Sequence, residues 1–216
     1  MKITKKKVLV VALAVCLAAI LSMGTLAWFN ASDSVTNDFH MADSADTPDE
    51  IFSVDVWEYI DGDTTTKDDD GHTFENIAPG SVYKKAPHVE NTGSYDQWIR
   101  VKVTVTNADA WIAALGNSYD LGTMFGGHDE TLWTRYEVGE YDGTKNTYTM
   151  VFYLNEKLAP DAVACLFETV TIPTELDQND MAFIDGKFEL TILAEAIQAD
   201  NTGDSAKAAF DAFWEN

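Results

Sequence analysis

The chain has 216 residues, of which 14 are basic and 36 acidic, and its formal charge at pH 7 is −22. Four lysines fall in the first seven residues, so the remainder carries 10 basic and 36 acidic residues, or −26. This balance excludes nucleic acid as a default partner and disfavours binding to an anionic membrane surface, because both need a cationic face.

The first predicted element is a signal helix. Four lysines precede an apolar run from Val8 to Leu21, and the small residues Thr25 and Ala27 occupy the −3 and −1 positions of a cleavage site. This arrangement predicts a secretory signal peptide, residues 1–27, that is cut between Ala27 and Trp28. The alternative is a retained anchor, because the uncharged segment is long enough to span a bilayer.

Only one cysteine would remain after this cleavage. Cys16 lies in the apolar run, and Cys165 lies in a second apolar stretch with no base close by in the sequence. The exported chain therefore has no intrachain disulfide, and Cys165 is expected to be a small buried residue rather than a nucleophile.

The exported part, residues 28–216, is predicted to be one domain built mainly of strands. In the clearest strand, Ile99, Val101, Val103 and Val105 alternate with polar or larger residues. Further strands, rich in residues that suit a pleated surface, are expected over 52–57, 132–138, 147–154, 165–172 and 186–199.

Turns and two short helices separate these strands. Pro79-Gly80 suits a type II turn, and Asp142-Gly143 suits a hairpin. Asn107 is expected to cap a helix that ends at Gly116, and a C-terminal helix is expected over 204–215. Many short strands with only local helices favour an all-β sandwich over alternating α/β units.

An acidic loop runs from Asp61 to Gly71 with the sequence DGDTTTKDDDG. A calcium loop needs oxygen ligands at alternating positions, and here two threonines interrupt that pattern. A solvated acidic loop is the prediction, with a weak calcium alternative that uses Asp61, Asp63, Asp68 and Asp70.

No catalytic motif is found in the sequence. The four histidines lie in different segments, without the H-E-x-x-H spacing that places two imidazoles around zinc. The G-x-S-x-G elbow and the phosphate-binding loop are also missing from the sequence. No catalytic residue, metal or cofactor is predicted, and the chain is not expected to be an enzyme.

Two stretches resemble a known family. The junction Gly24-Thr25-Leu26-Ala27-Trp28-Phe29-Asn30, followed by Val35-Thr36-Asn37-Asp38-Phe39, is similar to signal peptides cut by SipW-type signal peptidases of Gram-positive bacteria. The segments from Asn76 to Ser81 and from Val89 to Ser94 resemble the P-G and N-x-G-S block of TasA and camelysin (CalY) type exported proteins. The second block contains Pro79, Gly80, Asn91 and Gly93.

The resemblance implies a jelly-roll-like antiparallel β-sandwich with short peripheral helices. It also implies secretion to the cell surface or extracellular matrix of a Gram-positive bacterium, with a SipW-type signal peptidase as partner. The subunits would assemble into biofilm-matrix fibres, with residues 28–39 as a strand donated to the next copy through Trp28, Phe29, Val35 and Phe39.

Three alternatives stay open. The donor segment could instead form the first strand of its own sandwich. The protein could act as a monomeric surface adhesin or binding module on the same sandwich. Camelysin-like members have been classed as metallopeptidases, but the sequence shows no zinc motif that would carry this activity over.

Overall fold

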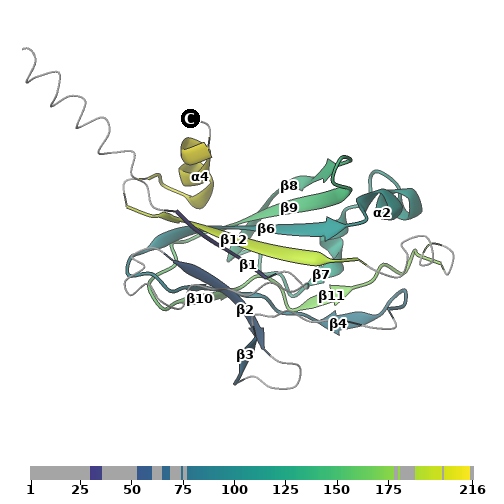
Figure 1. The fold of residues 1–216 in the computed structure, drawn as a ribbon, viewed down its shortest axis with the longest axis horizontal. Coiled ribbons are helices and arrows are strands. Elements are labelled where there is room, and N and C mark those ends of the chain that lie inside the picture. The colour runs from purple at the N-terminus through teal and green to yellow at the C-terminus, as the bar shows by residue number, and fades with distance from the viewer. Residues whose placement is uncertain are drawn as a thin grey trace, which may run out of the picture.

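The computed structural model describes residues 30–35, 53–59, 65–68, 74, 77–177, 180, 188–200 and 202–214 (Figure 1). The predicted signal helix lies outside these residues. The described helices are α2 (Ala108–Leu115), the 3-10 helix η1 (Leu121–Met124) and α4 (Ala206–Trp214). The strands are β1 (Asn30–Val35), β2 (Val54–Tyr59), β3 (Lys67–Asp68), β4 (Val82–Lys84), β5 (His88–Asn91), β6 (Gln97–Thr106), β7 (Phe125–Gly126), β8 (Trp133–Asp142), β9 (Thr147–Leu154), β10 (Val163–Cys165), β11 (Thr169–Thr171) and β12 (Leu190–Gln198).

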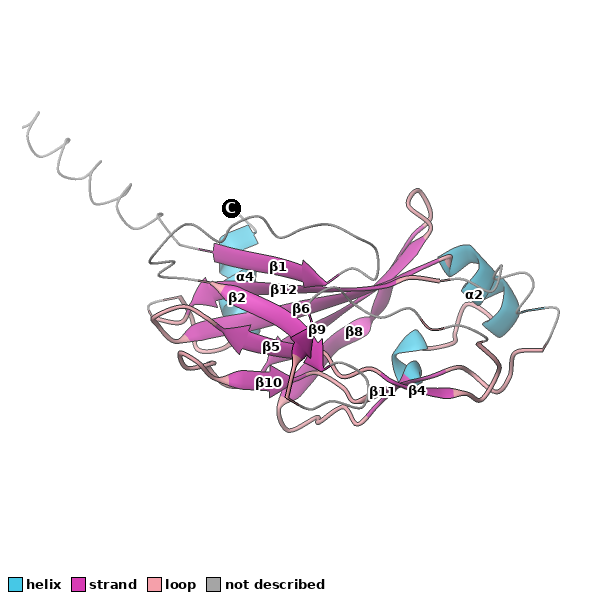
Figure 2. Cartoon of the chain, turned by 60° about the horizontal axis from the view of Figure 1, so that its bottom comes forward, coloured by secondary structure: helices cyan, strands magenta, loops and turns pink. Residues whose placement is uncertain are grey.

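The strands form two layers. One layer is a five-stranded sheet with the order β1-β12-β6-β9-β8. The other layer combines a four-stranded sheet, β10-β5-β2-β3, with a three-stranded sheet, β4-β11-β7 (Figures 1 and 2). All the pairings between these strands are antiparallel. The all-β sandwich predicted from the sequence is therefore confirmed.

The core lies between the layers and follows the alternation of β6. Val101 is fully buried and pairs with Ala194 of β12 on one side and Phe152 of β9 on the other. Val56 and Val89, also fully buried, come from the opposite layer. Each such side chain contributes about 1.5–3 kcal/mol relative to exposure, which is why the period-2 pattern decides the fold.

Helix α4 covers part of the outer face of the five-stranded sheet. Its residues Ala206, Ala209 and Phe210 are at most 1% exposed and pack against Trp98, Tyr153 and Ile197 of the sheet. The N–H of Ala208 donates to the hydroxyl of Ser205, at 3.2 Å, which caps the helix. The predicted C-terminal helix is thus present and begins as the capping pattern indicated.

The prediction of one strand over residues 165–172 is wrong, because this part of the chain contributes to two separate strands. Residues 163–165 pair with β5 as β10, whereas residues 169–171 pair with β4 and β7 as β11. Between them Leu166 and Phe167 are both fully buried, which a straight half-buried strand cannot achieve with consecutive residues. The N–H of Leu166 donates instead to the carbonyl of Pro87 as the chain passes from one sheet to the next.

The N-terminal cap of α2 also differs from the prediction. Asn107 occupies the N-cap position in a left-handed conformation, with φ of 58°, but its side chain makes no capping hydrogen bond. The side-chain oxygen of Asn146 accepts from the N–H of Asp109 instead, at 2.7 Å. Asn146 belongs to the β8–β9 turn, so the cap comes from a residue that is distant in sequence. The helix ends at Gly116, as predicted.

Candidate functional site

The segment predicted to be a donor strand lies at the edge of its own sheet. Residues 30–35 form β1, which pairs antiparallel with β12 from Asn30 opposite Ile197 to Val35 opposite Ile192. Figure 2 shows β1 at the outer edge of the sheet, beside β12 and across from β2. Within a single chain, residues 30–35 therefore adopt the alternative that the sequence left open, the first strand of its own sandwich.

The sequence of β1, NASDSV, is unusual for a strand that completes a sandwich. Only Ala31 and Val35 are apolar, whereas the neighbouring β12 contains fully buried Ile192 and Ala194. This sequence offers few apolar groups for burial, and a backbone hydrogen bond contributes only about 0.5–1.5 kcal/mol net. Of the strands in this sheet, β1 is therefore the one whose residue types least favour a strand.

The strand that receives β1 is firmly fixed on its other side. All nine residues of β12 pair with β6, from Leu190 opposite Val105 to Gln198 opposite Gln97. Removal of β1 would leave a complete row of β12 backbone groups without partners, while the register of β12 would stay set by β6. Such an edge can accept an extended segment from another chain.

The opposite edge of the sheet is β8. Its pairing with β9 shifts in register between Tyr136 and Glu140, and such a bulge twists an edge and weakens further pairing. The two edges of the five-stranded sheet therefore differ, with a regular six-residue strand on one side and a bulged strand on the other.

The other residues predicted for cleavage and strand donation, Ala27, Trp28, Phe29 and Phe39, lie outside the described residues. So do three of the weak calcium candidates, Asp61, Asp63 and Asp70. The fourth, Asp68, lies in β3 opposite Glu58 of β2. In the part of the chain that is described, no group of three or more His, Cys, Asp or Glu side chains is arranged to hold a metal ion.

The turn at Pro79-Gly80 has the expected geometry. Gly80 has φ of 77°, and the N–H of Ser81 donates to the carbonyl of Ala78 at 3.0 Å. The N–H of Gly80 donates to the carbonyl of Ile172 at 2.9 Å, which ties the turn to the end of β11. A residue with a Cβ would be strained at this position.

The N-x-G-S block forms a buried polar network. The side-chain oxygen of Asn91 accepts from the N–H of Gly93 at 2.9 Å and from the amide of Gln97 at 2.5 Å. The amide of Asn91 donates to the carbonyl of Leu158 at 2.7 Å, and both Asn91 and Gln97 are fully buried. The network fixes the β5–β6 connection. The sequence indicated Asn91 and Gly93, but no local pattern indicated Gln97.

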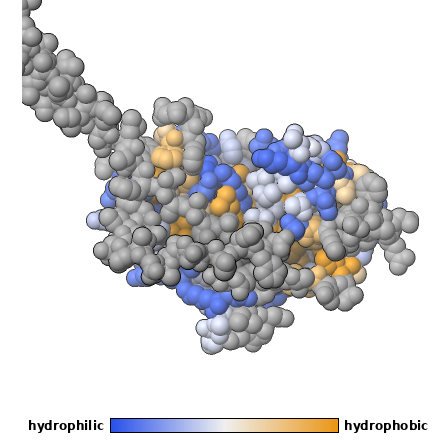
Figure 3. Space-filling model, viewed as in Figure 1, coloured by the Kyte–Doolittle hydropathy of each residue, from blue (hydrophilic) through white to orange (hydrophobic). Residues whose placement is uncertain are grey.

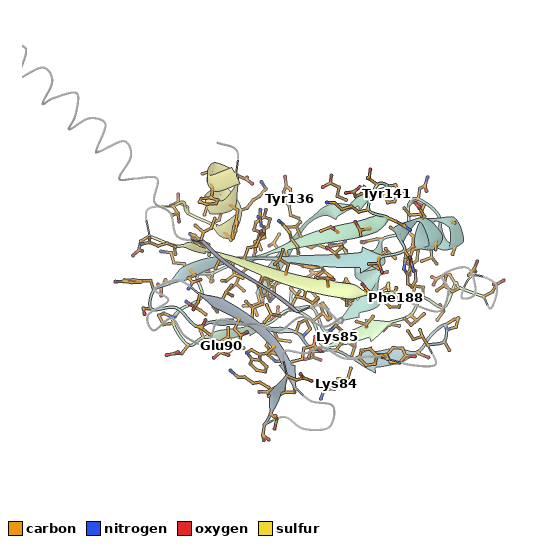
Figure 4. All side chains as sticks on the ribbon, in the orientation of Figure 1. Lys84, Lys85, Glu90, Tyr136, Tyr141 and Phe188 are labelled. Atoms are coloured by element: carbon orange, nitrogen blue, oxygen red, sulfur yellow. The ribbon has the colours of Figure 1, made fainter. Side chains whose placement is uncertain are left out.

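A buried ion pair was also missed by sequence reasoning. The ammonium of Lys85 lies 2.5 Å from a carboxylate oxygen of Glu58, and both side chains are 2% exposed. Figure 4 shows Lys85 between the layers and Lys84 on the outside of the molecule. The sequence does not show which of the two lysine side chains is buried, because this depends on where β4 ends relative to the sheet.

Burial shifts the pKa values of two neighbouring titratable groups, His88 and Cys165. His88 stacks on Trp57 with ring centroids 4.4 Å apart, and burial lowers the pKa of its imidazole. Cys165 lies opposite His88 in the β5–β10 register, but burial raises the pKa of its thiol to about 11. Its S–H donates to the carbonyl of Phe167 at 3.2 Å. A thiol with this pKa is a poor nucleophile at neutral pH.

In the face shown in Figure 3, hydrophilic residues gather over the five-stranded sheet between α2 and α4, with apolar residues in smaller groups. Among the described residues, no helix is long and apolar enough to cross a membrane.

No protein-family model, curated protein or solved structure matches this chain.

Proposed function

We propose that this chain is a secreted structural subunit of cell-surface or extracellular-matrix fibres, and that copies assemble by exchange of β1. The observation that supports the proposal is the position of β1, a six-residue, mostly polar strand at the open edge of the five-stranded sheet. The resemblance of two short stretches, residues 24–39 and 76–94, to TasA and camelysin type exported proteins is the second support.

Exchange of an edge strand has a small equilibrium cost. When β1 leaves β12 of its own chain and pairs with β12 of another copy, the same hydrogen bonds form again. The contact is head-to-tail, since each copy donates one strand and accepts another. Such contacts produce open-ended filaments when the rotation between copies does not close a ring.

Charge opposes this assembly. Each exported copy carries −26, so copies repel one another at low ionic strength. Repulsion between exposed charges is screened beyond about 10 Å at 0.1 M salt. Fibre growth should therefore accelerate with sodium chloride or calcium.

The test compares the chain that begins at Trp28 with a chain that begins at His40, by electron microscopy and light scattering at increasing protein and salt concentration. The longer chain should form fibres, and the truncated chain should stay monomeric or fold poorly. A longer chain that remains monomeric at high concentration and high salt would refute the proposal. Fibres from the truncated chain would place the donor strand elsewhere.

Export through a SipW-type signal peptidase is part of the same proposal. Cleavage between Ala27 and Trp28 requires small side chains at the −3 and −1 positions. Replacement of Ala27 by leucine should leave an uncleaved precursor in the membrane fraction, whereas N-terminal sequencing of the secreted wild type should begin at Trp28. Wild-type protein found at full length in the membrane would favour the retained anchor.

A further inference from the structure

A cavity of about 570 Å³ lies between α2 and the β8–β9 hairpin. Helix α2 and the segment after it supply one wall, and Tyr141 of β8 and Tyr148 of β9 supply the other. Figure 4 shows Tyr141 at the α2 end of the hairpin. The cavity is on the side of the sheet opposite to β1, with β12, β6 and β9 between β1 and β8.

The walls combine aromatic rings with a few polar groups. Trp111, Tyr119, Tyr141 and Tyr148 supply the rings. Trp111 and Tyr148 are 1% and 7% exposed, so they are fixed by packing, whereas Tyr141 is 45% exposed. Gly139 permits this packing, because a Cβ at that position would overlap with the ring of Tyr148.

The polar groups can both donate and accept hydrogen bonds. Asp109 lies on the exposed side of the cavity and accepts a hydrogen bond from the hydroxyl of Tyr141. This bond raises the pKa of Tyr141, and burial raises that of Tyr148, so both phenols keep their protons at neutral pH. Asn117 adds an amide to the lining.

The charges around the cavity select against anions. Asp109 lines it, the charge of Asp142 acts on Tyr141, and the charge of Asp120 acts on Tyr148. The one nearby cation that acts on Tyr148, Arg135, is already paired with Asp120 through a 2.8 Å hydrogen bond. Among the described residues, no lysine or arginine lines the cavity.

We propose that this cavity binds an uncharged hexose unit of a glycan. A pyranose ring has an apolar C–H face, which suits aromatic walls, and a rim of hydroxyl groups, which suits a carboxylate, an amide and phenols. Aromatic walls with a small number of convergent polar groups are the usual composition of a small-molecule site. The site is open on one side, so it can take a unit that remains linked to a longer chain.

The test measures binding to the mature chain by isothermal titration calorimetry. The probes are neutral tetrasaccharides of glucose, galactose, mannose and N-acetylglucosamine, with tetragalacturonate as the anionic counterpart. Asp109→Ala and Tyr141→Ala remove exposed lining groups. Tyr95→Ala is the matched control, because Tyr95 is 51% exposed and precedes the N-terminal end of β6, whereas α2 follows the C-terminal end of that strand.

At least one neutral tetrasaccharide should bind, and both lining variants should raise its Kd by about tenfold, which corresponds to about 1.4 kcal/mol. Tyr95→Ala should leave Kd unchanged, and tetragalacturonate should bind more weakly than the neutral probe. The inference is overturned if no neutral probe binds, if both lining variants bind as tightly as the wild type, or if tetragalacturonate binds equally well. Fibre formation does not depend on this cavity, so a negative result would leave the strand-exchange proposal intact.

Discussion

Gly80 occupies a backbone conformation that residues with a side chain rarely adopt. Its φ of 77° is unfavourable for any β-branched residue, and a Cβ there would lie 3.3 Å from the methyl group of Thr174. Gly80→Val should lower the free energy of unfolding by about 1–3 kcal/mol, measured by urea denaturation. Gly80→Asn adds the same Cβ but enters the left-handed region more easily, so it should cost less. Equal losses in both variants would show that the methyl contact, not φ, is responsible.

The ion pair between Glu58 and Lys85 should be costly to break. Glu58→Gln leaves the ammonium of Lys85 buried without its countercharge, and such changes cost about 3–5 kcal/mol. The double variant Glu58→Leu/Lys85→Met removes both charges and should recover most of this loss. Urea denaturation of the single and double variants measures both effects. A single variant as stable as the wild type would mean that the pair is solvated in solution.

Cys165 should be unreactive in the folded protein. Its pKa of about 11, raised mainly by burial, leaves very little thiolate at pH 8. Iodoacetamide should therefore modify the native protein far more slowly than the protein unfolded in urea, as measured by mass spectrometry. Equal rates in the two states would contradict the burial of this thiol.

At the residue scale, the features that could be predicted from the sequence are those that depend on residues adjacent in the chain. Pro79-Gly80 encodes its own turn, because proline restricts φ and glycine accepts a positive φ. The burial of Lys85 beside Glu58, and of Gln97 beside Asn91, depends on how separate strands align. No local pattern encodes that alignment, so these residues could not be identified from the sequence.

At the element scale, the start of α2 depends on the β8–β9 turn. The side chain of Asn146 accepts from the N–H of Asp109, and Asn146 itself has φ of 53°. Asn146→Ala should lower the free energy of unfolding by about 1–2 kcal/mol, because it removes the cap and strains the turn. Asn146→Asp keeps an acceptor oxygen and tolerates this φ, so its thermal denaturation should match that of the wild type. A wild-type melting temperature for Asn146→Ala would show that the cap contributes nothing.

The predictability of each strand follows from its burial. Strand β6 alternates buried and partly buried residues over most of its length, and this alternation made it recognisable in the sequence. Strands β9 and β12 were recognised from their content of residues that suit a pleated surface. The path from β10 to β11 was not recognisable, since Leu166 and Phe167 are both buried. Strand β1 was identified only through the family resemblance of its surroundings, because NASDSV has neither the alternation nor the composition of a strand.

At the scale of the whole molecule, the account depends on where β1 pairs. In the single chain, Ser34 of β1 lies opposite Leu193 of β12, a partly buried position. Directly paired residues in antiparallel strands are close enough for a disulfide. A cysteine pair at these two positions can therefore report whether β1 is in its own sheet or in that of a neighbour.

The most direct measurement uses the mature chain with Cys165 replaced by alanine in every variant. Ser34→Cys chains and Leu193→Cys chains, mixed and oxidised, should give a disulfide-linked species that contains one of each. The double variant Ser34→Cys/Leu193→Cys, oxidised as a monomer, should lock β1 in its own sheet and form no fibres until it is reduced. Fibres from the locked monomer, or the failure of the mixed single variants to cross-link, would contradict assembly by exchange of β1.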